Sequence, residues 1–257
     1  MIFAVAGFGL LIGSFLNVVV HRVPLGLSLA RPGSACPACA HPVRAYDNIP
    51  VLSWLVLRGR CRDCAHPIAA RYPAVELGTA ALFLLVAWRI GWTPYLGAVL
   101  VLAAAGLALV LIDLEHHRLP FGITGSAAAA TVPFLVADVA LYGADDVLVA
   151  VSSTGVWLLV YGGVWFLTAG RGMGLGDVAL APLLGLTLGW LGWGASLTGL
   201  LGGFVLGALV GLLLMAVGRA GRRSRVPHGP FMLAGAALGL FAGQPLWHAY
   251  LELTGLA

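Results

Sequence analysis

Long apolar stretches without a charged residue constrain the fold of this chain more than any other feature of its sequence. The longest covers residues 178–218, about twice the length that a helix needs to cross a hydrocarbon layer of about 30 Å. Because residues 192–194 read Gly-Trp-Gly near its middle, we expect two helices joined by a turn. A soluble domain with only 9% charged residues would expose extended apolar surface. The sequence therefore predicts an all-α polytopic membrane protein.

The remaining apolar runs can be assigned to spans in the same way. The run over residues 77–112 contains only Arg89, near a break at Gly91 and Pro94, so we expect two helices there. No basic residue precedes the first run, which favours a retained span over a cleaved signal peptide. We expect about eight transmembrane helices, within residues 1–20, 77–112 (two), 119–137, 147–169, 178–218 (two) and 229–251.

The basic residues restrict both the chemistry and the topology. All 14 are arginines, and the absence of lysine excludes P-loop nucleotide hydrolysis and Schiff-base or Ser-Lys nucleophiles. If the N-terminus lies outside, every arginine except Arg89 falls in a segment on one side of the membrane, which the positive-inside rule identifies as the cytoplasm. This distribution explains the net charge of +4 without a nucleic-acid partner.

One predicted span carries a regular repeat of glycines. A four-residue spacing places them on one helix face, where another backbone can approach closely. We expect this stripe to serve helix packing and assign no chemistry to it. Its members are Gly199, Gly203, Gly207 and Gly211.

Residues 22–73 differ in kind from the apolar runs around them. They contain all four cysteines, in two Cys-x-x-Cys pairs, a pattern typical of a zinc ribbon with four thiolate ligands. Two disulfides are the alternative, but thiols stay reduced in the cytoplasm, where the arginines place this segment. A metal also suits an insert of about 50 residues, which is too small for a large apolar core.

The predicted ligands of this structural zinc are Cys36, Cys39, Cys61 and Cys64. Four thiolates leave no open position for water, so the zinc would stabilise the insert and have no catalytic role. His41 and His66 are alternative ligands, although a surface or hydrogen-bonding role is the simpler interpretation.

Two acidic residues stand at the ends of apolar helices. Asp113 closes one predicted span and Asp177 opens another, both on the predicted cytoplasmic side. A carboxylate at membrane depth is costly and marks a candidate functional site, whereas an acid that reaches water, or one that complements a helix N-terminus, needs no function. Gly174 and Gly176, just before Asp177, would let an extended peptide approach the backbone closely. Two facing carboxylates that share one proton can activate water and polarise a peptide carbonyl, which is the chemistry of an aspartyl protease.

Neighbouring titratable residues are weaker candidates for catalysis, and the motifs of other protease classes are absent. Glu115 lies two residues beyond Asp113 and would face another side of the helix. His117 lies four residues beyond Asp113 and could bond to it, but an interfacial role is the simpler interpretation. The sequence contains neither a His-Glu-x-x-His zinc-protease motif nor a Gly-x-Ser-x-Gly nucleophile elbow.

Taken together, the motifs of this chain resemble those of the bacterial type IV prepilin peptidases, which are Gly-x-Gly-Asp intramembrane aspartyl proteases. The resemblance covers most of the chain, and its specificity comes from the combination of motifs because no single one is specific. These motifs are Gly13-Ser-Phe-Leu-Asn17 with His21-Arg22-Val-Pro24, Cys36 with Cys39, Asp47-Asn-Ile-Pro50 through Trp54, Arg58-Gly-Arg60-Cys61, Arg71-Tyr-Pro-Ala-Val-Glu76, Ile-Asp113-Leu-Glu-His with Leu-Pro120, and Gly172-Met-Gly174-Leu-Gly176-Asp177.

The resemblance implies catalysis by Asp113 and Asp177 and a prepilin or pseudopilin substrate that has a short basic leader and an apolar helix behind it. It implies cleavage after a leader glycine at the cytoplasmic face of the inner membrane. In relatives with a four-cysteine insert, methylation of the new N-terminal amine by S-adenosylmethionine often follows, a step for which this sequence shows no donor site. The implied organisation is a first helix at 1–21, a cytoplasmic cysteine domain at 22–73 and a seven-helix peptidase domain at 74–257.

Three positions depart from the family pattern, and none of them removes a catalytic acid. Ala179 stands where a lysine often follows the second aspartate, and Phe121 stands where an acid or amide often follows Leu-Pro. His228 stands where phenylalanine is usual.

Two other classes of function stay open on the sequence alone. A multi-pass transporter also uses intramembrane acids, but it usually shows internal repeats with helices broken near the midplane. A zinc-containing assembly factor without catalysis would use the cysteine insert for partner binding and would not need the aspartates.

Overall fold

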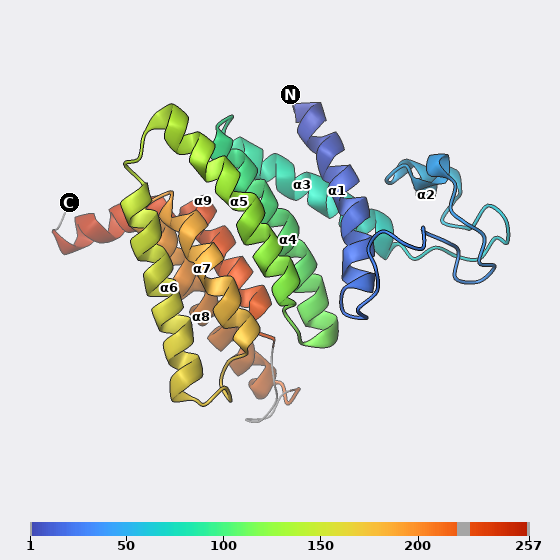
Figure 1. The fold of residues 1–257 in the computed structure, drawn as a ribbon. Helices are drawn as coiled ribbons and strands as arrows, with labels where there is room; N and C mark the ends of the chain where they lie inside the picture. Colours follow the sequence, from blue (N-terminus) through green and yellow to red (C-terminus); the bar gives the residue numbers. More distant parts are fainter. Residues whose placement is uncertain (1, 220–226, 256–257) are drawn as a thin grey trace.

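The computed structural model describes residues 2–219 and 227–255, and it is almost entirely helical over these ranges (Figure 1). In the described ranges there is no β-strand, and two isolated antiparallel bridges lie in the cysteine insert. The helices in chain order are α1 (Ile2–Arg22), a short 3₁₀ helix η1 (Ala45–Asn48), α2 (Leu52–Val56), α3 (Arg71–Ile90), α4 (Pro94–His116), α5 (Phe121–Tyr142), α6 (Val147–Leu167), α7 (Leu175–Gly189), α8 (Trp193–Ala216) and α9 (Gly229–Thr254).

The eight apolar helices expected from the sequence all form, but one is shorter than a membrane span. Within the described residues, seven helices are long and apolar enough to cross a bilayer, whereas α7 has only 15 residues. At 1.5 Å per residue α7 measures about 22 Å, less than the hydrocarbon thickness of about 30 Å. Turns separate the helices where the sequence predicted them, at Gly91 and Gly192, whose φ angles of 77° and 101° favour glycine. The prediction of an all-α polytopic membrane protein is confirmed.

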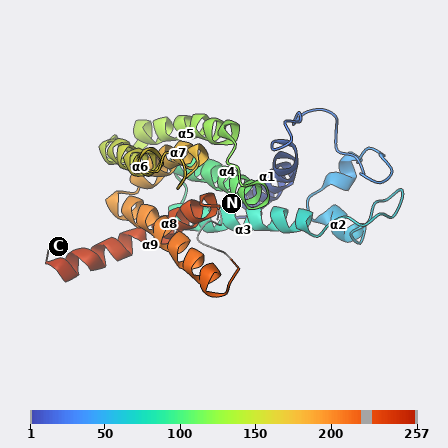
Figure 2. The same cartoon turned by 90° about the horizontal axis from the view of Figure 1, so that it is seen from below.

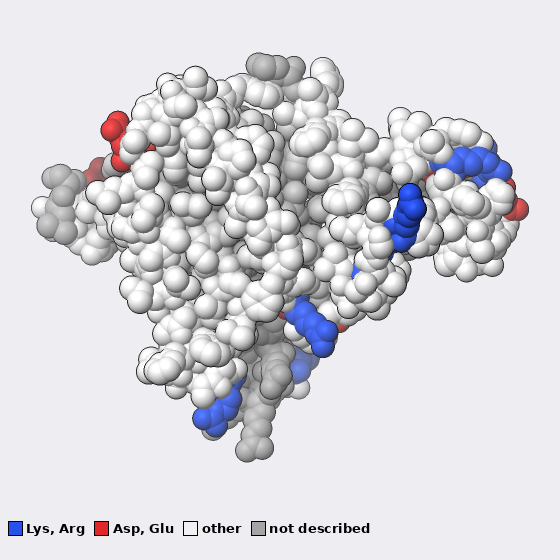
Figure 3. Space-filling view, viewed as in Figure 1, with Lys and Arg blue, Asp and Glu red and all other residues white. Residues whose placement is uncertain are grey.

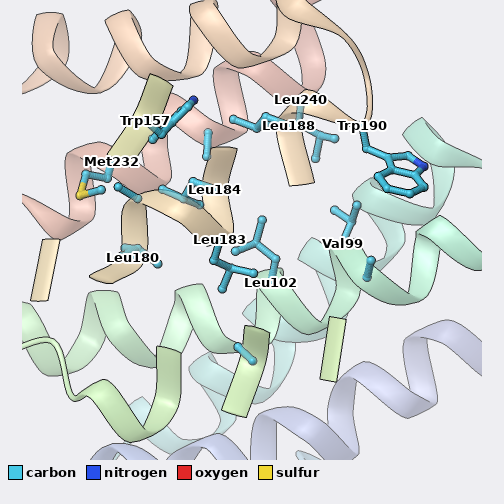
Figure 4. Close-up of a cluster of buried hydrophobic side chains, with 14 of the residues drawn as sticks. Val99, Leu102, Trp157, Leu180, Leu183, Leu184, Leu188, Trp190, Met232 and Leu240 are labelled. Atoms are coloured by element: carbon cyan, nitrogen blue, oxygen red, sulfur yellow. The ribbon is translucent and has the colours of Figure 1, made fainter. Parts of the chain in front are cut away.

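Helix α7 lies in the middle of the bundle, in contact with α4, α5, α6, α8 and α9. Its Leu180 and Leu184 have no exposed surface. A helix enclosed by protein need not match the bilayer thickness, because neighbouring helices cover the backbone at its ends. Figure 4 shows the leucines of α7 among side chains from α4, α6 and α9, which are Val99, Leu102, Trp157, Met232 and Leu240.

The glycine stripe of α8 packs against α9 at three of its four positions. A Cβ added to Gly235 of α9 would lie only 2.4 Å from both the carbonyl oxygen of Gly199 and the backbone nitrogen of Gly203. Gly207 faces two side chains at the start of α9, and a Cβ on Gly211 would meet no atom within 4 Å. The expected role of the stripe in packing is therefore confirmed for its first three glycines.

Helices α1 and α3 form a second close pair at the side of the bundle and carry the cysteine insert between them (Figures 1 and 2). A Cβ on Gly9 of α1 would lie 2.6 Å from the Cα of Ala80 of α3, so the two backbones touch. The insert projects away from α5–α9 in both views. Helix α3 begins at Arg71, inside the predicted 22–73 domain, and the boundary after residue 73 stays a prediction.

Charged side chains gather at different ends of the molecule (Figure 3). On the face shown, arginines lie at the lower end of the helices and on the insert, and an acidic patch lies at the upper left. The α5–α6 connection on that upper side contains Asp145 and Asp146. The insert arginines lie beside the bundle at the upper right of this view, and the orientation of the chain in the membrane stays a prediction. Arg222, Arg223 and Arg225, which also support that topology, lie outside the described residues.

Candidate active site and metal centre

Asp113 lies in the last turn of α4, at the lower end of the bundle in Figure 1. Only 5% of its surface is exposed. Its Oδ2 accepts a hydrogen bond of 3.2 Å from the backbone N–H of Gly229, the first residue of α9. A Cβ at position 229 would lie 2.8 Å from that oxygen, so the approach of α9 requires glycine there.

Asp177 lies in the first turn of α7 and is 8% exposed. Its Oδ2 accepts a hydrogen bond of 3.0 Å from the backbone N–H of Gly174, which satisfies a donor at the start of the helix. Its Oδ1 is buried and accepts no hydrogen bond within the described part of the chain. Helix capping therefore explains one oxygen of this carboxylate and leaves the other without a structural role.

Leu119 brings the starts of α7 and α9 together just beyond the end of α4. A Cβ on Gly176 would lie 2.7 Å from the Leu119 Cβ, and one on Gly229 would lie 3.0 Å from the Leu119 Cδ2. The structure thus places the two predicted acids at the same end of the bundle, both largely buried.

The rival acid has a different environment. Glu115 is exposed and forms an ion pair with Arg71 at the start of α3. The side chain of His117 is also exposed, and its backbone N–H ends α4 by donating to the Asp113 carbonyl at 2.9 Å. Neither side chain belongs to the buried pair, as the sequence predicted.

A pocket of about 300 Å³ lies between α6, α8, the start of α9 and the glycine loop before Asp177, and His228 forms part of its wall. His228 and the donor Gly229 were missed as site residues by the sequence reasoning, which treated His228 only as a departure from a family pattern. The sequence feature that could have identified them is a titratable residue followed by a glycine at the N-terminus of an apolar helix. The other two departures lie outside this pocket: Phe121 begins α5 with an exposed side chain, and Ala179 is partly buried on α7.

The cysteine insert contains two turns of the same design. Each Cys-x-x-Cys pair is followed by Ala-His-Pro. The first turn closes through a hydrogen bond of 3.0 Å from the Cys36 N–H to the His41 carbonyl, and the second through one of 2.8 Å from the Cys61 N–H to the His66 carbonyl. Both histidines thus close their turns through the backbone.

The four sulfur atoms converge on one point. They lie within 4.8 Å of one another, and the Cys36 and Cys64 sulfurs are 3.7 Å apart. Tetrahedral zinc with Zn–S bonds of about 2.3 Å requires sulfurs about 3.8 Å apart. All four cysteines are free thiols, so the cluster fits a four-thiolate metal site, and the disulfide alternative is not adopted.

Backbone dipoles and crowding act on these thiols in opposite directions. The N–H groups of Cys39 and Ala38 lower the pKa of Cys36 to about 6, which favours the thiolate form that binds metals. The N–H of His66 lowers the pKa of Cys64, but desolvation and the neighbouring thiols together raise it to about 12. A bound cation would relieve this crowding of thiolates.

Ion pairs and one buried acid hold the insert in place. Arg62 binds Asp47 at 2.6 Å and lowers the pKa of that carboxyl. The backbone N–H of Val51 donates to the Glu76 Oε2 at 2.7 Å, and Glu76 is a buried residue of α3. The Trp54 ring N–H donates to a backbone carbonyl within the insert. The insert is therefore fixed both internally and to the second membrane helix.

Comparison with known proteins bears directly on these two sites. Residues 8–90 match the bacterial peptidase A24 N-terminal domain, and residues 100–214 match the type IV leader peptidase family. A prepilin leader peptidase/N-methyltransferase of Pseudomonas aeruginosa is 36% identical over 96% of this chain and 92% of its own length. The chain belongs to the type IV leader peptidase family.

Further members of this family show similar identity. A Burkholderia pseudomallei protein of the same name is 38% identical over 96% of this chain and 86% of its own length. One from Myxococcus xanthus is 44% identical over 84% of this chain, and the alignment spans 64% of the Myxococcus protein. No solved structure matches the chain.

Family membership confirms the resemblance inferred from the sequence motifs and makes the chain an enzyme of the prepilin peptidase type. It favours this class over the transporter and the non-catalytic assembly factor. The N-terminal family match includes α1 from residue 8 onward, the cysteine insert and α3, and the second match includes Asp113 and Asp177. The individual roles of the two aspartates and of the four cysteines stay predictions.

Proposed function

We propose that this leader peptidase is an aspartyl endopeptidase in which Asp113 and Asp177 form the catalytic pair. The observation that carries the proposal is the burial of both carboxylates at one end of the bundle, each with one oxygen bound to a backbone N–H. A buried acid without a full set of partners is costly. The cost of burying this pair therefore favours a chemical role for it over a purely structural one.

The pair would act on a peptide placed between the starts of α7 and α9. One carboxylate, ionised, takes a proton from water, and the other, neutral, donates a hydrogen bond to the scissile carbonyl. The hydrogen bonds from Gly174 and Gly229 fix one oxygen of each acid, and a substrate and its attacking water would have to enter between them. The unpartnered Oδ1 of Asp177 is the natural acceptor of the proton from water.

The substrate we propose is a prepilin or pseudopilin, as the names of the relatives indicate. An apolar cavity of about 350 Å³ between α4 and α9 suits the apolar segment of such a substrate. Val110 and Pro230 line it near the aspartates, and Tyr95 and Phe241 line it farther away. A basic leader would remain in water beside the acidic pair. The arginines at the same end of the bundle support a cytoplasmic location of the site in the inner membrane, with the N-terminus outside.

The catalytic assignment can be tested with neutral variants in membranes that contain a cognate prepilin. Asp113→Asn and Asp177→Asn preserve side-chain size and should each abolish leader cleavage, measured as the mobility shift of the pilin on an immunoblot. Glu115→Gln is the matched control because Glu115 is an exposed acid on the same helix turn, and it should cleave normally. Retained cleavage in either Asn variant would refute the assignment.

We propose that the metal of the insert is zinc, held by Cys36, Cys39, Cys61 and Cys64. Four thiolates would leave no open coordination position, so the ion would supply folding free energy to the insert. Elemental analysis of the purified protein should find about one zinc per chain, and chelation should make the insert sensitive to protease.

The printed name of the relatives includes N-methyltransferase, and this supports a second proposed step. The new N-terminal amine would be methylated with S-adenosylmethionine as co-substrate. Mass spectrometry of the mature pilin N-terminus reports the cleavage position and the added methyl group in one measurement. An unmethylated N-terminus in the presence of S-adenosylmethionine would reject this step and leave the peptidase assignment intact.

A further inference from the structure

Helix α2 of the cysteine insert carries apolar side chains on its outer surface. Leu52, Leu55 and Val56 occupy the i, i+3 and i+4 positions, which share one helix face, and they are 60%, 57% and 74% exposed. Trp54 points into the insert instead, where its ring N–H donates to the Ile68 carbonyl at 3.1 Å. We call the three exposed residues the α2 face. Contiguous apolar surface of this kind is typical of an interaction site.

The α2 face lies close to a membrane-spanning helix. The backbone N–H of Val51, at the start of α2, donates to the Oε2 of Glu76 at 2.7 Å, and Glu76 is a buried residue in the second turn of α3. Helix α3 is long and apolar enough to cross a bilayer. This hydrogen bond thus ties the start of α2 to a membrane helix, near the end at which the insert joins that helix.

The insert lies at the side of the helices and not beyond their ends. Figure 1 shows it to the right of α1, and Figure 2, turned by 90°, again shows it to the right of the bundle, with α2 near the start of α3. A bilayer that surrounds the helices therefore reaches the insert, so lipid is the natural neighbour of α2. Because arginines are costly within hydrocarbon, the insert belongs at the level of the lipid headgroups.

Positive charge accompanies the α2 face. Residues 22–73 contain seven arginines and only two acids, and both acids already form ion pairs with arginines of the insert. Arg58 and Arg60 follow the end of α2, are exposed, and form no ion pair with any residue that the structure describes. The negative surface of an anionic bilayer attracts such arginines, and the neighbouring apolar face adds the burial of apolar area to this attraction.

We propose that the α2 face docks on the bilayer surface: Leu52, Leu55 and Val56 enter the headgroup region, and Arg58 and Arg60 contact the phosphates of anionic lipids. The partner is lipid because lipid surrounds the helices beside which α2 lies, and because its phosphates complement the arginines. Docking attaches the insert to the membrane at a point between its two connections, the end of α1 and the start of α3. The inference depends neither on the catalytic aspartates nor on the metal.

Quenching of a fluorescent side chain by lipid tests this contact in the full-length protein. An environment-sensitive fluorescent amino acid is introduced at position 56 and, in a separate control protein, at position 43. Both positions carry an exposed valine of the insert, but Val43 lies in the first cysteine turn, where its N–H donates to the Ser34 carbonyl at 2.8 Å. The proteins are reconstituted in phosphatidylcholine vesicles with brominated acyl chains, with and without phosphatidylglycerol. Leader cleavage in the same vesicles shows that both labelled proteins are folded.

We expect brominated lipid to quench the probe at position 56 at least about twofold more strongly than the probe at position 43. Phosphatidylglycerol should strengthen the quenching at position 56, and the double variant Arg58→Gln, Arg60→Gln should remove that increase. Equal quenching at both positions would show that α2 has no particular contact with lipid, and an unquenched probe at position 56 would show that the face meets water or protein. Either result would overturn the docking. A response to phosphatidylglycerol that persists in the double variant would overturn the role of the two arginines.

Discussion

The contact between α8 and α9 leads to the prediction that Gly235→Ala destabilises the whole bundle. The added Cβ would lie 2.4 Å from the Gly199 carbonyl oxygen and 2.4 Å from the Gly203 nitrogen. Ordinary van der Waals contact begins at 3.4 Å, and both opposing atoms belong to a backbone that cannot rotate away. The two helices must therefore separate by about 1 Å along the seam.

A gap of that size removes about a quarter to a half of the dispersion energy of each contact across it. Because helix association in a membrane depends mainly on such packing, we expect a loss near the usual cost of overpacking, about 1–3 kcal/mol. Replacing glycine in a helix interior returns up to about 1 kcal/mol of helix propensity. With the full propensity gain, the net loss is at most about 2 kcal/mol, which corresponds to a fall in Tm of up to about 8 °C.

The assay is thermal unfolding of the purified protein in detergent, with Gly211→Ala as the control. Residue 211 lies on the same stripe, but its added Cβ would meet no atom within 4 Å, so the control should match or exceed the Tm of wild type. Leader cleavage by Gly235→Ala should also fall, because α9 carries the N–H that binds Asp113. Equal Tm values for the two variants would refute the packing argument.

Two further predictions concern the insert. Cys36→Ala should remove the zinc measured by elemental analysis and make the insert sensitive to protease. His41→Ala should leave the zinc content unchanged. Loss of zinc in both variants would contradict the assignment of four cysteines as the ligands. Arg62→Ala should raise the pKa of Asp47 toward its ordinary value, since that pKa is lowered mainly by the hydrogen bond from Arg62. A lowered carboxyl pKa stabilises the fold at neutral pH, and the benefit is lost as pH falls through the folded-state pKa. This variant should therefore make the insert more protease-sensitive near pH 7, and the difference from wild type should shrink as pH falls below about 4. A difference that does not shrink in acid would contradict this.

The sequence predicts most of the helices because a bilayer imposes a length and an apolar composition on each of them. The turns at Gly91 and Gly192 could be predicted because glycine is the residue that adopts their positive φ angles most easily. The length of α7 could not be predicted, since the uncharged stretch over residues 178–218 looks the same whether lipid or protein surrounds the helix. Whether protein surrounds α7 depends on the assembled bundle and cannot be read from the local amino-acid composition.

The acids of the site were visible in the sequence for a related reason. A carboxylate at the end of an apolar helix is rare, so Asp113 and Asp177 stand out in a chain with only ten acidic residues. The groups that hold them were less visible, because backbone N–H donors occur at every residue except proline. Gly229 is a donor to Asp113 only because α9 starts beside the end of α4, and that placement depends on tertiary packing.

The two acids are held in different ways, and this difference has a functional consequence. Asp177 is bound by Gly174, three residues before it, within the first turn of its own helix. Asp113 is bound by Gly229, which is 116 residues away and lies six residues before the seam glycine at position 235. The position of Asp113 thus depends on the packing of α9, whereas that of Asp177 is set locally. Carboxylates in unequal environments can divide the roles of acid and base between them, so in the proposed mechanism the packing of the helix seam would affect the chemistry of the pair.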